Sequence, residues 1–440
     1  MSGLSLGLLA LAATFTLLVL RVHIGLTMLV GGALCFLAVN DGDFSALLFS
    51  LNNLAWSRLS NYDLAVIPLF VLMGQFATHG GLSKAIFRCA AAFVGHLRGG
   101  LGMSAIGACA GFGAICGSSL ATSATMSQVA LPELRRHNYS GRLATATVAA
   151  GGTLGILIPP SVPLIIYAVL TQESIAKLFV AAVVPGLLAA VGYLIVVRLM
   201  VAREPEGHQH SEPASAAERI KALLQVVPVL GVFLVVIVGI YGGWTNPTEA
   251  ASIGAAACGL LALTQGGLRW EGLQRCLLGT AETSGMIFLV LLGADLLNAG
   301  LALTQMPTEL AEWVKASGLA PILVLSAILL LYLLLGCVMD SLAMILLTIP
   351  IFYPVIMGLE FFGMTEVEKS IWFGILALMV VEIGLIHPPL GMNLFIVNKV
   401  ARDVPYLETA KGVLPFLASD LLRIVLLVAF PGICLWLLSL

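Results

Sequence analysis

The sequence predicts an all-α polytopic membrane protein with an inverted-topology repeat, two re-entrant helical hairpins and two proline-broken transmembrane helices. Hydrophobic residues make up 60% of the 440 positions, and the mean hydropathy is +1.05. Only 10% of the residues are charged, whereas a soluble domain carries about 25%. In addition, two Pro-Pro pairs, at 159–160 and 388–389, interrupt apolar runs that are long enough to cross a bilayer.

Composition also excludes some classes of protein. A net charge of −2 lacks the positive charge expected of a nucleic-acid-binding protein, so the lipid bilayer is the expected environment and no nucleic acid is expected as a partner. The eight cysteines lie singly in apolar surroundings, which is typical of small buried side chains rather than of a metal site. Residues 1–20 have no basic start, so we expect a retained first helix.

Apolar runs of sufficient length predict the remaining spans in chain order. These runs fall at 4–20, 24–39, 62–79, 178–199, 222–241, 248–264, 281–300 and 412–440, with amphipathic stretches at 44–58, 84–98 and 268–279. The long polar loop at 203–221 divides the chain into two halves.

Two longer apolar regions are predicted to be hairpins. Region 101–131 is cut at Gly117-Ser118-Ser119, and region 319–357 is cut at residues 336–341. As a single helix the first would be about 46 Å long, well beyond a hydrocarbon core of about 30 Å. Folded at its interruption, each region reaches the middle of the membrane and returns.

The distribution of Lys and Arg predicts the orientation. If loop 203–221 is cytoplasmic, most of the 21 basic residues lie inside, provided that each hairpin enters and leaves by one face. The first hairpin then enters from the cytoplasm, the second enters from outside, and the N-terminus is periplasmic. The basic residues left outside are Arg58, Lys177, Lys315 and Lys369.

The two halves are predicted to be related. Aligning the two Pro-Pro pairs also aligns Ser174-Ile175 with Asp403-Val404, and the two broken helices then run in opposite directions. The predicted organisation is N-terminal scaffold helices at 1–83, first-repeat transport elements at 84–175 with broken helix 141–171, a central scaffold at 176–300, second-repeat transport elements at 301–411 with broken helix 370–400, and a C-terminal scaffold helix at 412–440.

Paired prolines at membrane depth predict a cation site. Proline brings no N–H and unwinds the helix, and the freed carbonyls are tolerated only against protein, water or an ion. A matched pair of such breaks is typical of secondary transporters. At the first tip, hydroxyls and carbonyls of Ser118, Ser119 and Thr122 would meet the break formed by Gly155, Ile158 and Pro160. A small-residue packing face is the alternative interpretation.

The second tip carries the carboxyl group of Asp340, for which two compatible interpretations stay open. It lines a substrate cavity, fixes the hairpin or relays a proton, or it caps the returning half-helix. His387, before the second Pro-Pro pair, is either a proton-sensitive group or a hydrogen-bonded structural histidine. Asn393 is a candidate cavity amide. Residues 245–250 (Thr-Asn-Pro-Thr-Glu-Ala) indicate a turn followed by a capped helix rather than a substrate site.

Together these motifs resemble the large membrane subunit of TRAP transporters (tripartite ATP-independent periplasmic transporters, DctM type). The resemblance covers essentially the whole chain. It rests on Gly117-Ser118-Ser119, on residues 155–161, 245–250 and 384–395, and on the similar segments Pro68-Leu69-Phe70…Gly74 and Arg98-Gly99-Gly100-Leu101.

The resemblance implies a sodium-coupled symporter in the bacterial inner membrane that imports an organic anion such as a dicarboxylate. A periplasmic binding protein would deliver the anion, a small four-helix subunit would pack on the scaffold, and the domain with both hairpins would move as an elevator. Implied sodium ligands are Ser118, Ser119, Gly155, Ile158 and Pro160 at the first site and Gly336, Gly384, His387 and Leu390 at the second. Expected substrate contacts are Ser119, Thr122, Asp340 and Asn393.

One position departs from the family. His387 stands where the family usually has Thr, so a hydroxyl ligand is missing and a proton could replace sodium there. Other functions stay open: a stand-alone ion- or proton-coupled anion transporter, a passive channel, or an intramembrane enzyme that uses Asp340 and His387. The sequence contains no HExxH or nucleophile motif, which disfavours the enzyme.

Overall fold

The computed structural model describes residues 3–20, 22–204, 213–264 and 268–438. Secondary structure within these ranges is helical throughout. Among the described residues, five helices are long and apolar enough to cross a membrane, or six if one bent pair counts as a single span. Residues 205–212 of the predicted loop 203–221 lie outside the described residues. The loop is shorter than predicted, because one helix ends at Arg203 and the next, capped by Ser215, already begins at Ala216.

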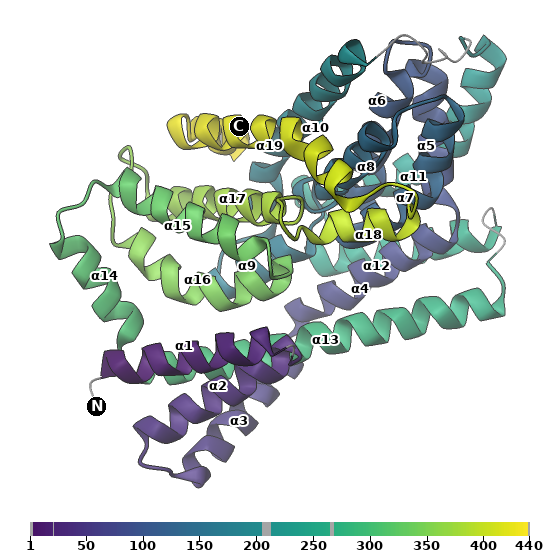
Figure 1. Ribbon diagram of the computed structural model, residues 1–440. Coiled ribbons are helices and arrows are strands. Elements are labelled where there is room, and N and C mark those ends of the chain that lie inside the picture. The colour runs from purple at the N-terminus through teal and green to yellow at the C-terminus, as the bar shows by residue number, and fades with distance from the viewer. Residues whose placement is uncertain (1–2, 21, 205–212, 265–267, 439–440) are drawn as a thin grey trace.

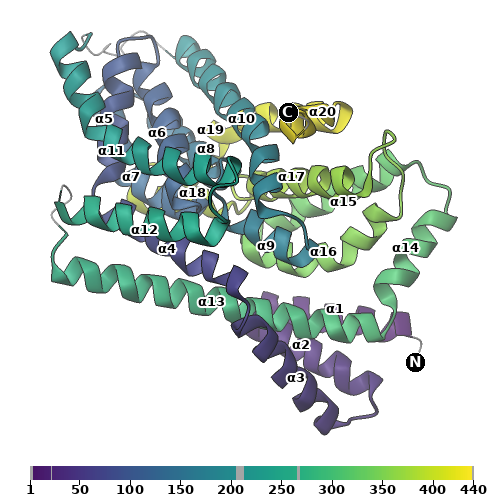
Figure 2. The ribbon, with the colours of Figure 1, turned by 180° about the vertical axis from the view of Figure 1, so that it is seen from behind.

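One layer of the molecule consists of helices from the N-terminal and central regions packed along α13 (Trp270–Leu303), which runs beside α2 and α4 (Figures 1 and 2). The α2 and α13 backbones touch, since a Cβ on Gly32 would lie 2.5 Å from Leu297 N. The helices that contact α13 in this layer are α1 (Gly3–Val19), α2 (Ile24–Val39), α3 (Phe44–Leu59), α4 (Val66–His79) and α14 (Met306–Ala316). Next to them, η1 (Tyr62–Ala65) and α12 (Pro247–Thr264) pack on α4, and α11 (Ala216–Tyr241) packs on α12.

Two element predictions in these regions were wrong. The predicted pieces 268–279 and 281–300 form one helix, α13. Gly279 between them lies within the continuous helix, and a Cβ on it would lie 3.3 Å from Nε2 of Gln75, so α4 packs closely at this point. The predicted span 412–440 is α19 (Tyr406–Ala429), followed by α20 (Gly432–Leu435) and η2 (Trp436–Leu438). It stops there because Pro431 has no N–H to continue the helix.

The first group of interrupted elements follows the predicted pattern. Helices α6 (Gly100–Cys116) and α7 (Ser119–Arg136) pack together as a hairpin, and Gly117 turns the chain with φ of 63°. Helices α8 (Gly141–Leu157) and α9 (Val162–Thr171) are separated by the Pro-Pro break. The amphipathic α5 (Leu82–Val94) and the long α10 (Ile175–Arg203) pack against α6.

The second group repeats these elements. Helices α15 (Pro321–Gly336) and α16 (Ser341–Met357) form a hairpin, and α17 (Glu366–Gly384) and α18 (Met392–Val400) are separated by the second break. Lys369 joins the far end of this hairpin to α17, because its Nζ donates to the carbonyls of Met357 and Leu359, both at 2.7 Å.

The two broken helices occupy the interior. Every residue of α8 from Leu143 onward is buried, and so is every residue of α17 from Lys369 onward. Their Pro-Pro breaks therefore lie at the ends of the two most deeply buried helices. This placement brings both hairpin tips to the centre of the molecule, where the predicted site residues gather.

Candidate cation and substrate site

The first hairpin tip and the first break are in backbone contact. A Cβ on Gly113 would lie 2.4 Å from Gly155 Cα, and a Cβ on Gly155 would lie 2.9 Å from the carbonyl oxygen of Ser118. Pro159 and Pro160 bring no N–H to the carbonyls of Gly155 and Ile156, which residues 159 and 160 would satisfy in a continuous helix. The predicted grouping of tip and break residues is therefore present.

Hydroxyl groups concentrate at this first tip. Ser118 caps α7, its Oγ accepting from Ala121 N at 3.4 Å. Ser119 Oγ lies 3.0 Å from the carbonyl oxygen of Gly152 in α8. Thr122 is fully buried, and its Oγ1 has no hydrogen-bond partner among the described residues. These oxygens, together with the break carbonyls, form a hard-ligand set of the kind that alkali cations prefer.

The second tip and break make a matching contact. Gly384, like Gly155, stands four residues before the first proline of its pair, and a Cβ on it would lie 2.5 Å from Gly336 Cα. His387 Nδ1 lies 3.3 Å from Cys337 Sγ. The predicted ligands Gly336, Gly384 and His387 thus lie together, with a thiol beside the imidazole that the sequence did not indicate.

Several carbonyls of the second break are already engaged. His387 N donates to Gly384 O at 3.2 Å, and Asn393 N donates to Leu385 O at 3.0 Å. Tyr406 OH lies within hydrogen-bond distance of the carbonyls of both Pro389 and Leu390, between which its single O–H is shared. Leu390, a predicted ligand, therefore has an engaged carbonyl, and its side chain is exposed. The second break offers fewer free oxygens than its sequence alone indicates.

Asp340 is the N-cap of α16, because its carboxylate accepts from Ala343 N at 3.5 Å. The capping interpretation is thereby confirmed. The turn at residues 245–250 is also confirmed as a cap: Glu249 N donates to Asn246 Oδ1 at 2.8 Å, and Asn246 N donates to the Glu249 carboxylate at 2.9 Å.

Glu382 joins the two tips, and the sequence analysis missed it. One of its oxygens accepts from Ser119 Oγ at 2.8 Å and the other from Ser341 Oγ at 3.0 Å. Its side chain is buried, with 1% exposure. Asn393 completes the cluster, its Nδ2 donating to Ser119 Oγ at 3.2 Å. A lone acidic residue within the apolar run 371–386 was the signal that could have identified Glu382.

A small cavity of about 150 Å³ lies beside the first tip. Its walls combine Gly117 and Ser118 of the first hairpin with Leu342 of the second, and with Gln75 of α4 and Thr283 of α13. Of the predicted substrate residues, Ser119, Thr122 and Asn393 are fully buried and do not line this cavity. Ser118, which was predicted as a cation ligand, does line it.

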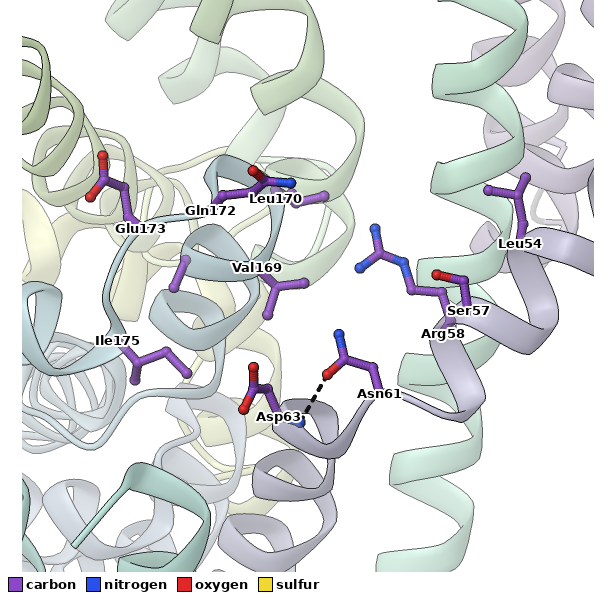
Figure 3. A pocket seen from close by; sticks show the side chains of 11 residues that line it. Leu54, Ser57, Arg58, Asn61, Asp63, Val169, Leu170, Gln172, Glu173 and Ile175 are labelled. Atoms are coloured by element: carbon purple, nitrogen blue, oxygen red, sulfur yellow. Dashed lines mark hydrogen bonds between the residues drawn. The ribbon is translucent and has the colours of Figure 1, made fainter.

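A larger hollow of about 560 Å³ lies between the α3–η1 corner and the end of α9 (Figure 3). Arg58 and Asn61 project into it from one side, and Gln172 lies on the other. The Arg58 guanidinium makes two hydrogen bonds to the buried carboxylate of Asp295 in α13. This hollow is the most polar opening described and lies at the end that the orientation prediction places outside.

The fold and these contacts define a multi-pass membrane transport protein in which two hairpin tips meet two broken helices. Residues 11–433 match the family described as "Tripartite ATP-independent periplasmic transporter, DctM component". The chain belongs to this family, so it is a transport permease and not an enzyme, and the family resemblance seen in the sequence is confirmed.

Relatives with printed functions cover most of the chain. It is 35% identical to the C4-dicarboxylate TRAP transporter large permease protein DctM of Pseudomonas aeruginosa, over 92% of this chain and 92% of the relative. It is 33% identical to the sialic acid TRAP transporter large permease protein SiaM of Vibrio cholerae, over 85% of each. It is 32% identical to the ectoine/5-hydroxyectoine permease UehC of Ruegeria pomeroyi, over 85% of this chain and 86% of the relative.

A solved structure supports the fold. The crystal structure of the YdaH transporter of Alcanivorax borkumensis, described as having an unusual topology, aligns with a TM-score of 0.62 over 89% of this chain and 90% of that chain. Sequence identity is 14%, so this likeness concerns the fold alone.

Proposed function

We propose that this protein is the large subunit of a sodium-coupled symporter that imports a small organic anion across the bacterial inner membrane. The observation that carries the proposal is the matched pair of tip–break contacts, Gly113 with Gly155 and Gly336 with Gly384. Each contact places hairpin residues beside carbonyls that prolines have left without helical donors.

Sodium is assigned to the first tip–break contact. The ligands there are the hydroxyl and carbonyl oxygens of Ser118 and Ser119 and the backbone oxygens of Gly155, Ile158 and Pro160. Oxygen donors suit a hard cation, and burial excludes competing water. The second site has to rely on backbone oxygens of Gly336, Gly384, His387 and Leu390, because the His387 side chain offers nitrogen rather than a hydroxyl.

The carried anion is proposed to be a small carboxylate. The relatives are named for C4-dicarboxylates, sialic acid and ectoine, which share a carboxylate group. The cavity of about 150 Å³ offers hydrogen-bond donors from Gln75 and Ser118, and it is well below the roughly 300 Å³ of pockets for drug-sized ligands. We place the substrate there, which assigns its contacts to Gln75 and Ser118 instead of the predicted Ser119, Thr122, Asp340 and Asn393, none of which lines the cavity.

Delivery and movement complete the proposal. A periplasmic binding protein would release the anion into the polar hollow beside Arg58, and a small four-helix subunit would pack on the scaffold. The elements carrying both hairpins would then slide against α4 and α13 as an elevator. The cavity supports this arrangement, because its walls come from both groups of elements.

Reconstitution in vesicles tests the function. This large subunit is assembled in proteoliposomes with a small TRAP subunit and a periplasmic binding protein from the same organism and with a labelled carboxylate. Uptake is expected to need an inward sodium gradient and the binding protein. Uptake that proceeds without any ion gradient would reject the symporter.

A proton-coupled transporter is the second candidate, and His387 is the observation that favours it. Its imidazole sits at the second tip where a hydroxyl would suit sodium, 3.3 Å from the Cys337 thiol. The same vesicles distinguish the two: a proton gradient in sodium-free buffer would drive uptake only in the proton-coupled case.

A further inference from the structure

Among the described residues, the buried carboxylates differ in whether a basic side chain forms an ion pair with them. Asp295 forms an ion pair with Arg58, and Asp420 lies 3.0 Å from Arg423 in a second ion pair. Glu382 is equally buried, yet no described Lys, Arg or His forms an ion pair with it. A charged carboxylate in a membrane interior is costly, so this position needs either a proton or a bound cation to neutralise it.

The surroundings of Glu382 are rich in oxygen and poor in donors. Ser119 has one hydroxyl hydrogen but two acceptors within reach, the Glu382 carboxylate at 2.8 Å and Gly152 O at 3.0 Å. Asn393 directs its Nδ2 to Ser119 and Ala149, which leaves its Oδ1 without a partner. Ser123 Oγ, beside Gly152, is also unpartnered and fully buried.

An interior that leaves buried oxygens unpaired is unfavourable unless something positive binds there. A water molecule would donate hydrogen bonds but would not neutralise the carboxylate. A monovalent cation is coordinated by the lone pairs of several oxygens, and its charge also neutralises the carboxylate. Hydroxyl, amide and carboxylate oxygens are ligands for a hard alkali ion rather than for a soft metal.

We propose that Glu382 is the fixed countercharge of an interior alkali-cation site, formed with the hydroxyls of Ser119 and Ser341, which adjoins the first tip–break site through Ser119 and is distinct from the second. This inference rests on the proposed function, which it deepens by naming a further ion-binding group. Because Ser119 belongs to the first hairpin and Ser341 to the second, a cation bound here contacts both tips at once. Cation binding at the tip of the first hairpin would then depend on the position of the second hairpin tip.

Direct ion binding tests the site. Radioactive sodium binding is measured on the purified permease in lipid nanodiscs, without substrate, for the wild type, Glu382→Gln and Ser341→Ala. We expect Glu382→Gln to bind one sodium ion fewer. Ser341→Ala, which keeps the carboxylate, should bind the same ion about tenfold more weakly, as removal of a supporting ligand does.

The control is Glu366→Gln, an exposed acid in the first turn of the same helix, which should bind sodium as the wild type does. Unchanged sodium number and affinity in both Glu382→Gln and Ser341→Ala would overturn the inference. Ser341→Ala keeps the test decisive if Glu382→Gln fails to fold. The proposed function fails separately, if uptake by the wild-type protein needs no sodium gradient.

Discussion

Gly155 and Gly384 show how single residues decide the geometry of both proposed ion sites. Each lies on a broken helix where a hairpin backbone approaches so closely that no Cβ fits. Their role is to admit the neighbouring backbone, and the carbonyls at the break become reachable from the tip only because that space is kept.

Replacing either glycine with alanine is therefore expected to reduce uptake. Gly155→Ala and Gly384→Ala force the tip away from the break at a cost of about 1–3 kcal/mol. Gly231→Ala in α11 is the matched control, because a Cβ there meets nothing within 4 Å. Uptake rate and thermal midpoint are measured for all three, and wild-type uptake in both site variants would contradict the assignment.

Ser119 and Pro160 are predicted to matter more for coupling than for folding. Ser119→Ala removes a hydroxyl ligand, and Pro160→Ala restores an N–H that competes for a break carbonyl. Both should raise the sodium concentration needed for half-maximal uptake. Uptake titrated against sodium tests this, with thermal melting to monitor the fold; a sodium dependence identical to the wild type in both variants would reject the first site.

At this scale sequence reasoning found the tip and break residues but missed Glu382 and Cys337. Prolines, glycines and serines have local effects on the backbone, so their structural roles can be predicted from the sequence alone. The bond from Glu382 to Ser119 and the contact of Cys337 with His387 join segments far apart in the chain. Only the packing of the two hairpins determines such pairings.

Whole elements are held at their ends by basic side chains. Arg135, near the end of the first hairpin, lies 2.7 Å from Asp403 in the loop after α18. The hydrogen bond from Arg135 keeps the pKa of the Asp403 carboxyl below its usual value. Because the pKa of Asp403 is lowered in the folded protein, the ion pair contributes fully to stability above the ordinary pKa of about 3.9. This contribution to stability is lost as the pH falls through the lower pKa of the folded state.

Asp403→Asn is thus expected to lower the thermal midpoint slightly, by the same amount throughout the neutral pH range. The difference should disappear in high salt, because the ion pair is exposed and its charges are screened. Thermal midpoints of wild type and variant, measured in low and about 1 M salt, provide the test. A difference that persists undiminished in high salt would show that the residue acts through packing instead.

Predicted helix boundaries were correct where a residue type forces the backbone out of the helical conformation, and they were wrong at positions without such a residue. Both Pro-Pro pairs and both tips appear where predicted. The junction inside α13 was mispredicted because a glycine permits a helix to end but does not require it, and here Gln75 fills the space beside Gly279. The predicted span 412–440 ran past Pro431, whereas α19 ends at Ala429, two residues before that proline.

At the scale of the whole molecule, the proposed elevator requires the first hairpin to move along α4. Gly74 of α4 faces the end of α6, where a Cβ would lie 3.4 Å from Cys116 Sγ. A cysteine at position 74 would therefore stand within reach of the native thiol and could lock the two groups together.

Gly74→Cys is expected to form a disulfide with Cys116 under a mild oxidant and to lose uptake, which a reductant then restores. Gly74→Ser and Gly74→Cys combined with Cys116→Ser are the controls; neither should respond to the oxidant. Full uptake by the crosslinked protein, with the disulfide verified by mass spectrometry, would show that α4 and α6 do not slide past one another.

The hydrogen bonds from Lys369 to the carbonyls of Met357 and Leu359 attach the far end of the second hairpin to α17. In the proposed transport cycle, a movement of α16 relative to α17 would therefore be smallest at this end and largest at the tip, at Asp340 and Ser341. We expect any opening of this half of the protein to begin beside the proposed cation site.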